Sequence, residues 1–183
     1  MTKPISPQDI EHLVQLRANV ERFMEDVARR YGRIGSFLLD IAPQDHKGAR
    51  PFFPANVRID TLDINPDSSA TYIADLCHCV DLIGHDRYDF VVCTEVLEHT
   101  RQPFDAVASI LAILQPGGMA FVTTPFNFRI HGPLPDCWRF TEHGLRELFK
   151  PFEILELNAL ECEDRFLMPI QYTLVARKPL RAR

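Results

Sequence analysis

The stretch from Tyr88 to His99 constrains the fold of this chain more than any other part of its sequence. It begins as an apolar run of strand length and ends in a polar, acidic segment. Apolar residues at helical spacing follow over 104–114, and a Pro-Gly-Gly turn at 116–118 then precedes a second apolar run over 119–124. This order predicts a strand–helix–strand unit in which the polar end of the first strand marks the ligand-binding side.

The remaining apolar patterns extend this unit to a whole domain. A helix should occupy most of residues 1–32, because Ser6 can cap it, Pro7 suits its first position and Gly32 ends it. The predicted strands cover residues 37–42, 58–64, 72–74, 88–94, 119–124, 152–160 and 170–178, and no helix separates the last two. We therefore expect an α/β fold: a Rossmann-like, mostly parallel, seven-stranded sheet with helices on both faces and a C-terminal antiparallel hairpin.

Composition and charge exclude several functional classes. The chain has 183 residues, which suits a single domain over 1–183, and its formal net charge of −5 gives no electrostatic basis for binding nucleic acid or an anionic membrane. No apolar run reaches the ~20 residues that a membrane-spanning helix needs, and the N-terminus does not read as a signal peptide. The cysteines number five, an odd count that favours reduced thiols in a cytoplasmic protein.

Acidic residues recur where the predicted strands end. Asp40, Asp63 and Asp75 lie at or just after the ends of the first three strands, and Thr94 and Glu95 end the fourth. In open α/β sheets the ligand lies outside the carboxyl ends of the strands, so these side chains should face one cleft. A carboxylate at position 63 can accept hydrogen bonds from both hydroxyls of a ribose, and one at position 75 can accept from an adenine amino group. The pattern therefore predicts a nucleotide-type cofactor.

Over residues 37–150 the chain resembles the class I S-adenosylmethionine-dependent methyltransferases, most specifically at 95–99 and at the Pro-Gly-Gly of 116–118. The resemblance implies S-adenosyl-L-methionine as cofactor, with Asp63 at the ribose, Asp75 and Leu76 beside the adenine, and residues 94–96 along the methyl-donor side. The expected cofactor-binding residues are Asp40, Ala42, Gln44, Asp63, Ile64, Asp75, Leu76, Thr94 and Glu95.

The turn after the first predicted strand departs from the family pattern. Where the family usually has a glycine-rich turn, this chain has Ala42 and Pro43, and the proline should push Ala42 toward extended backbone. Two interpretations follow: the loop binds the cofactor through side chains such as Gln44, or the domain is a degenerate, non-catalytic binding or scaffolding subunit. A nicotinamide cofactor is less favoured, because a dinucleotide has phosphates to cradle and the Gly-x-Gly-x-x-Gly motif is missing.

Residues 125–140 form a long aromatic and polar segment on the side of the predicted cofactor. Related methyltransferases of bacterial cell-surface and secondary-metabolite pathways carry a similar Pro-Asp-x-Trp-Arg-Phe-Thr stretch, which implies an acceptor-site wall. We predict that four residues of this loop bind the substrate: Arg129, Asp136, Trp138 and Arg139. The alternative is that Trp138 and Phe140 anchor the loop in the core.

The predicted reaction is transfer of a methyl group to an oxygen or nitrogen of a small or carrier-bound metabolite, with His131 or His99 as the base. A homodimer or a partner subunit is one expected way to complete the acceptor site. We predict no metal site, because Cys77, His78, Cys79 and His85 match no standard zinc spacing.

Overall fold

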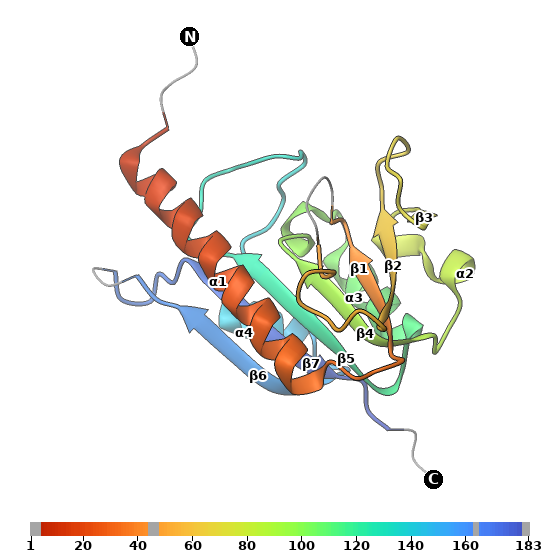
Figure 1. Ribbon diagram of the computed structural model, residues 1–183. Helices are drawn as coiled ribbons and strands as arrows, with labels where there is room; N and C mark the ends of the chain where they lie inside the picture. Colours follow the sequence, from red (N-terminus) through yellow and green to blue (C-terminus); the bar gives the residue numbers. More distant parts are fainter. Residues whose placement is uncertain (1–4, 44–47, 163–164, 181–183) are drawn as a thin grey trace.

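The computed structural model describes residues 5–43, 48–162 and 165–180. Its first element, α1 (Pro7–Tyr31), begins where the sequence predicts, because the Ser6 side chain accepts a hydrogen bond of 3.0 Å from the Asp9 amide. The buried stripe of this long helix includes Leu16, Met24 and Val27. The helix crosses one face of the sheet, and its N-terminal part extends beyond the sheet edge (Figure 1). No helix in the described ranges is long and apolar enough to span a membrane.

A seven-stranded sheet forms the centre of the molecule, in the order β3-β2-β1-β4-β5-β7-β6. The strands are β1 (Phe37–Ile41), β2 (Arg58–Asp63), β3 (Tyr72–Ile73), β4 (Tyr88–Thr94), β5 (Leu114–Pro125), β6 (Glu153–Leu160) and β7 (Gln171–Arg177). The first five pair in parallel, whereas β7 is antiparallel to both β5 and β6. The predicted fold class, with its closing hairpin, is confirmed.

Short helices cover the face of the sheet opposite α1. They are η1 (Leu76–His78), α2 (Val80–Ile83), η2 (Leu97–His99), α3 (Pro103–Ile113) and α4 (Glu142–Leu148). Strand β4 divides its side chains between the two faces: Val91 and Cys93 pack into the core under α3, while Phe90 and Val92 pack into the core under α1. Burial on both faces explains why this strand reads as a continuous apolar run.

The sequence predicted that the Pro-Gly-Gly segment forms a turn ahead of its strand. This prediction is wrong, because the segment lies within β5. The pairing of β4 with β5 shifts from Tyr88↔Leu114 to Phe90↔Met119, so residues 115–118 form an irregular bulge. Gly117 adopts a φ of +83°, which glycine tolerates and other residues rarely do. The residue that follows β7 holds the bulge, because the Gly117 amide donates to the carbonyl of Lys178 at 3.0 Å.

Candidate active site

The strand order reverses between β1 and β4, which are neighbours although they are far apart in sequence. Strands β2 and β3 continue the sheet on one side of this point, and β5 continues it on the other. Such a switch point leaves a crevice outside the carboxyl ends of the two central strands, where open α/β sheets bind their ligands. The acidic residues that the sequence singled out lie at this edge.

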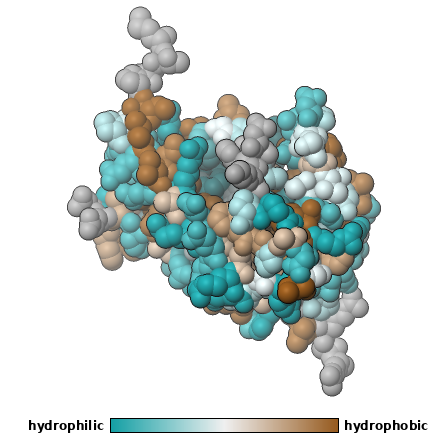
Figure 2. Space-filling model, viewed as in Figure 1, coloured by the Kyte–Doolittle hydropathy of each residue, from teal (hydrophilic) through white to brown (hydrophobic). Residues whose placement is uncertain are grey.

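A cleft of about 1310 Å³ opens at the switch point. Its walls come from α1, the tips of β1 and β4, residues 48–54 and the loop over 128–133. The volume exceeds what a single drug-sized ligand requires, so the cleft has room for a cofactor beside a second small molecule. Hydrophobic side chains are exposed on the N-terminal half of α1 (Figure 2), and Ile10 and Val14 are among them.

Asp40, at the tip of β1, places a buried carboxylate on the wall of the cleft. One oxygen accepts a hydrogen bond of 2.7 Å from the Ala49 amide, which returns the chain over the strand tip. Gly48 makes this return possible, since a Cβ there would lie 2.2 Å from the Asp40 carboxylate. Burial raises the pKa of Asp40 to about 6, and the bond from Ala49 lowers it only in part.

Glu95 follows directly after β4 and adopts a φ of +55°. Its Oε1 atom accepts two hydrogen bonds, from the Thr123 hydroxyl at 2.8 Å and from the Gln171 side-chain amide at 2.7 Å. Gln171 in turn accepts a bond of 2.7 Å from Asn19 on α1. Burial raises the pKa of Glu95 to about 7, and the hydrogen bonds from Gln171 and Thr123 oppose this shift. Glu95 thus ties the strand tip to β5, β7 and, through Gln171, α1.

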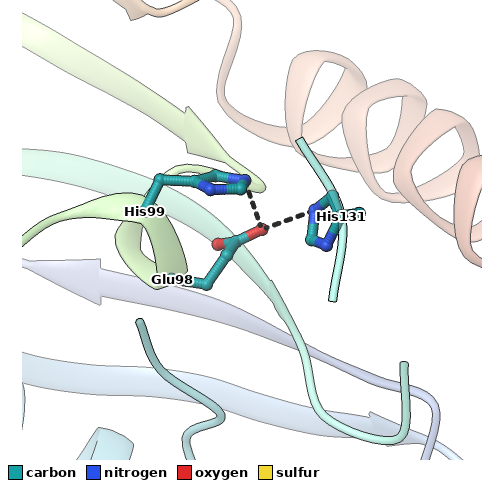
Figure 3. Close-up of side chains that lie close together, drawn as sticks. All are labelled: Glu98, His99 and His131. Carbon is teal, nitrogen blue, oxygen red and sulfur yellow. Dashed lines mark ion pairs between the residues drawn. The ribbon is translucent and has the colours of Figure 1, made fainter. Parts of the chain in front are cut away.

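Three residues beyond Glu95, the chain places a second glutamate between two histidines (Figure 3). The Oε1 atom of Glu98 lies 3.7 Å from Nε2 of His99 and 3.7 Å from Nε2 of His131. The two imidazole rings meet edge to face with centroids 4.8 Å apart. Both histidines line the cleft, so this group forms part of its wall.

Glu98 itself is fully enclosed, with a side-chain exposure of 0%. Neither of its carboxylate oxygens has a hydrogen-bond partner among the described residues. Burial, followed by the charge of Glu95, raises the pKa of Glu98 well above its ordinary value. A buried carboxylate without donors is rare in folded proteins, which makes this residue the most unusual polar group in the site.

The loop after β5 holds His131 in place by contacts within the loop. Asp136 accepts hydrogen bonds of 2.5 and 2.8 Å from the two terminal nitrogens of Arg139, and the same pairing lowers the pKa of Asp136 to about 2. The Asp136 carboxylate lies 3.1 Å from Nδ1 of His131 and also accepts from the His131 backbone amide. Trp138 donates its indole N–H to the carbonyl of Thr100 at 2.8 Å.

Comparison with known proteins identifies the family. A family model described as a methyltransferase domain matches residues 15–159, well over half of the chain. The chain belongs to this methyltransferase-domain family. This match confirms, at the level of the family, the resemblance to S-adenosylmethionine-dependent methyltransferases that the sequence showed. A 39-residue stretch is 41% identical to a ubiquinone biosynthesis O-methyltransferase of Aeromonas salmonicida, a match that spans 21% of this chain but only 16% of that protein.

Solved structures with low sequence identity share the fold of this methyltransferase. The cyclase SpnF superposes with a TM-score of 0.69 at 17% identity, covering 87% of this chain and 81% of its own. A methyltransferase from Methanosarcina mazei gives 0.66 at 16% identity, with 85% and 98% covered. An N1-methyltransferase of Burkholderia thailandensis, solved with 1,6-didemethyltoxoflavin and S-adenosylhomocysteine, gives 0.62 at 15% identity, with 98% and 93% covered. These likenesses show the fold alone.

The structure of the methyltransferase divides the predicted cofactor-binding residues into two groups. Four of them line the cleft, namely Asp40, Ala42, Thr94 and Glu95, whereas Asp63, Ile64, Asp75 and Leu76 are outside its described lining. The second group lies further along the same sheet edge, at the ends of β2 and β3. There the Asp63 carboxylate accepts from the Asn65 amide and that of Asp75 from the Cys77 amide, each at 2.9 Å. Gln44 lies outside the described residues.

The predicted conformation of Ala42 is wrong. Pro43 does not push it into extended backbone; its φ is +51°, in the left-handed region. The Ala42 amide donates to the Leu62 carbonyl at 2.7 Å and so extends the β1–β2 pairing by one residue, after which the chain must turn sharply. A left-handed alanine costs about 1–2 kcal/mol, so the methyltransferase has strain where its family usually has glycine.

His99 and His131, the two histidines that the sequence singled out, both line the cleft, whereas sequence reasoning gave Glu98 no role in the chemistry. The only signal was its position beside His99 in the turn after a buried strand. The four predicted substrate-binding residues, Arg129, Asp136, Trp138 and Arg139, are not among the described residues that line the cleft. Asp136 and Arg139 bind each other within the loop, and Trp138 donates to the Thr100 carbonyl. Of the two aromatic residues that the alternative interpretation placed in the core, Phe140 is buried, whereas Trp138 is 41% exposed.

Proposed function

We propose that this methyltransferase transfers a methyl group from S-adenosyl-L-methionine to an oxygen or nitrogen atom of a small or carrier-bound metabolite. The observation that carries the proposal is one cleft that combines the tips of β1 and β4 with a pair of histidines on its far wall. The first part suits a cofactor, and the second suits the atom that loses a proton when it is methylated. When bound, the cofactor supplies an activated methyl group on a sulfonium centre.

The residues at the strand tips fit a cationic cofactor without phosphate groups. Asp40 carries a carboxyl group into the cleft, and Glu21 and Glu25 add acidic side chains from α1. An ammonium and a sulfonium are favoured by such surroundings, whereas a pyrophosphate would be repelled. Asp63 and Asp75, further along the edge, are proposed to hold the ribose and the adenine.

His131 is proposed as the residue that accepts the proton of the acceptor. Burial lowers the pKa of His131, so the ring is neutral near pH 7 and can take a proton. Its Nδ1 atom is held by Asp136, so Nε2 carries the lone pair. Asp136 and Arg139 act here as positioning residues. His99, whose Nε2 lies 3.7 Å from the Glu98 carboxylate, is the second candidate base.

The acceptor is proposed to lie between α1 and the loop after β5. This part of the cleft is lined by apolar side chains, among them Leu13, Leu16, Phe52 and Phe128. A metabolite with a flat or apolar body would bury that body here while its nucleophilic atom faces the histidines. Arg17, which follows Leu16 on α1, adds a cationic side chain to the lining of the cleft.

The cofactor assignment is tested by measuring the binding of S-adenosylhomocysteine to the full chain with titration calorimetry. We expect saturable binding in the wild type and a loss of affinity of at least about 10-fold in Asp63→Ala, because a buried carboxylate that accepts charged or paired hydrogen bonds contributes ~1.5–3 kcal/mol. The matched control is Asp67→Ala, which removes an exposed carboxylate from the same turn. Absence of binding in the wild type would instead favour the non-catalytic binding or scaffolding subunit.

A further inference from the structure

The fully buried carboxylate of Glu98 is the starting point. With 0% exposure and no hydrogen-bond donor among the described residues, it lacks what buried acids normally have. Unpaired buried charge costs several kcal/mol, and proteins keep such groups where a proton or a cation balances them. The nearest polar atoms are the Nε2 atoms of His99 and His131, each 3.7 Å from Oε1.

The tautomers of the two histidines follow from their other contacts. Nδ1 of His99 lies 3.0 Å from the carbonyl oxygen of Pro135, which can only accept a hydrogen bond. Nδ1 of His131 lies 3.1 Å from the carboxylate of Asp136 and 3.4 Å from the carbonyl of Arg129. Both Nδ1 atoms must therefore carry the proton, and each neutral ring presents the lone pair of Nε2 to Glu98. Three electron-pair donors thus converge on one point (Figure 3).

This arrangement is the one that proteins use to hold metal ions. A metal-binding histidine almost always donates its other ring N–H to a carboxylate or a backbone carbonyl, and both histidines do so here. In the part of the chain that the structure describes, Glu98, His99 and His131 are the one group of His, Cys, Asp or Glu whose ligand atoms all lie within 4.8 Å of one another. In a tetrahedral site, ligand atoms about 2.1 Å from a shared ion are about 3.4 Å apart, so the Glu98 oxygen must approach each histidine by roughly 0.3 Å and the two histidine nitrogens must approach each other by up to roughly 1.4 Å.

We propose that Glu98, His99 and His131 bind a divalent first-row transition-metal ion, with the remaining coordination positions open to the cleft. Two imidazole nitrogens and one carboxylate oxygen suit manganese, iron, cobalt or zinc, whereas magnesium prefers oxygen ligands alone. The loop contacts of Asp136 and Arg139 then keep His131 oriented as a ligand.

The site has a consequence for the acceptor, and this part rests on the proposed function. Because His99 and His131 line the cleft, an acceptor oxygen could coordinate the ion directly beside the cofactor. A bound divalent ion would lower the pKa of a coordinated hydroxyl, whose proton would pass to water. The oxygen would then take the methyl group from the sulfonium sulfur, with S-adenosylhomocysteine as the leaving group. With the ion in place, the histidines serve as ligands and do not act as bases.

Titration calorimetry with ZnCl₂ and MnCl₂ on the chelator-treated full chain tests the site directly. We expect one equivalent to bind, MgCl₂ to bind far more weakly, and CoCl₂ to give the visible absorption of a nitrogen- and oxygen-ligated ion. His131→Asn should lose at least ~100-fold in zinc affinity and Asp136→Asn about 10–100-fold. His143→Asn, which alters an exposed histidine on α4, should bind like the wild type.

Glu98→Gln distinguishes loss of the metal site from misfolding of the protein. This variant removes the buried charge and should fold at least as well as the wild type, yet its melting temperature should no longer rise with zinc. The proposal is overturned if the wild type takes up none of zinc, manganese and cobalt, or if Glu98→Gln and His131→Asn bind zinc as tightly as His143→Asn does. Binding of S-adenosylhomocysteine to the metal-free chain separates the two proposals, because it persists if only the metal site fails and is lost if the cofactor assignment fails.

Discussion

The tip of β4 and the turn that follows it hold two glutamates in opposite situations. At the tip, Glu95 is bound by the Thr123 hydroxyl and the Gln171 amide. In the turn, Glu98 is more deeply enclosed and has neither kind of donor among the described residues. A carboxylate that is satisfied by its own protein is part of the framework, whereas one left unsatisfied is available to a ligand. The comparison therefore separates structural from functional acids by their partners, although both belong to one short motif.

The largest expected change in stability comes from removing Glu95, the glutamate whose carboxylate has hydrogen-bond partners. Glu95→Ala should lower the free energy of unfolding by roughly 3–5 kcal/mol, because it leaves the buried Thr123 hydroxyl and Gln171 amide without their shared acceptor. Equilibrium unfolding in urea measures the change. Glu95→Gln keeps an acceptor oxygen and should recover most of the loss. Equal destabilisation by both variants would show that charge, rather than the hydrogen bonds, holds the strand tip.

Asp40 tests an intermediate case, a buried acid with one donor. Its pKa is about 6 in the folded protein and near its ordinary value of 3.8 in the unfolded chain, so the fold favours the protonated form. The stability that protonation provides is complete below about pH 4 and is lost as the pH rises to and above 6. Asp40→Asn should therefore be up to about 3 kcal/mol more stable than the wild type at pH 8, since each pKa unit corresponds to ~1.4 kcal/mol.

The measurement for Asp40 is the difference in unfolding free energy between variant and wild type at pH 8 and at pH 4. At pH 4 the advantage of Asp40→Asn should shrink strongly, because the wild-type side chain is then largely neutral as well. Asp67→Asn, at an exposed position, controls for the general change in net charge. A difference that does not depend on pH would rule out Asp40 as the titrating group.

For Glu98, the glutamate without hydrogen-bond partners, we expect a smaller change in the free energy of unfolding, opposite in sign to that of Glu95→Ala. Glu98→Gln should raise the free energy of unfolding of the metal-free protein by about 1–2 kcal/mol, because an amide is cheaper to bury than an unpaired carboxylate. Thermal unfolding with and without a chelator measures it. If Glu98→Gln destabilises the protein as Glu95→Ala does, the two glutamates are equivalent and the distinction between framework and site is wrong.

The sequence predicted the fold well because periodicity and strand-end residues are local signals. The burial of β4 on both faces and the hairpin of β6 and β7 follow directly from runs of apolar residues. The partners of the two glutamates are not local: Gln171 lies 76 residues from Glu95, and His131 reaches Glu98 only through the fold of its loop. Which acid is satisfied therefore depends on tertiary contacts that spacing does not encode.

The smallest expected change in stability concerns the backbone conformation of the residues that follow the two central strands. Ala42 and Glu95 follow the two central strands, and both have positive φ, +51° and +55°. Ala42→Gly should raise the free energy of unfolding by about 0.5–1 kcal/mol, because the relieved strain of ~1–2 kcal/mol exceeds the added entropy of glycine in the unfolded chain. Ala55→Gly, at an exposed position without positive φ, should instead lower stability slightly. If urea midpoints fall equally for both variants, Ala42 is not strained. If the urea midpoint rises for Ala42→Gly alone and this variant also binds S-adenosylhomocysteine more tightly, the absence of glycine at position 42 lowers ligand affinity as well as stability.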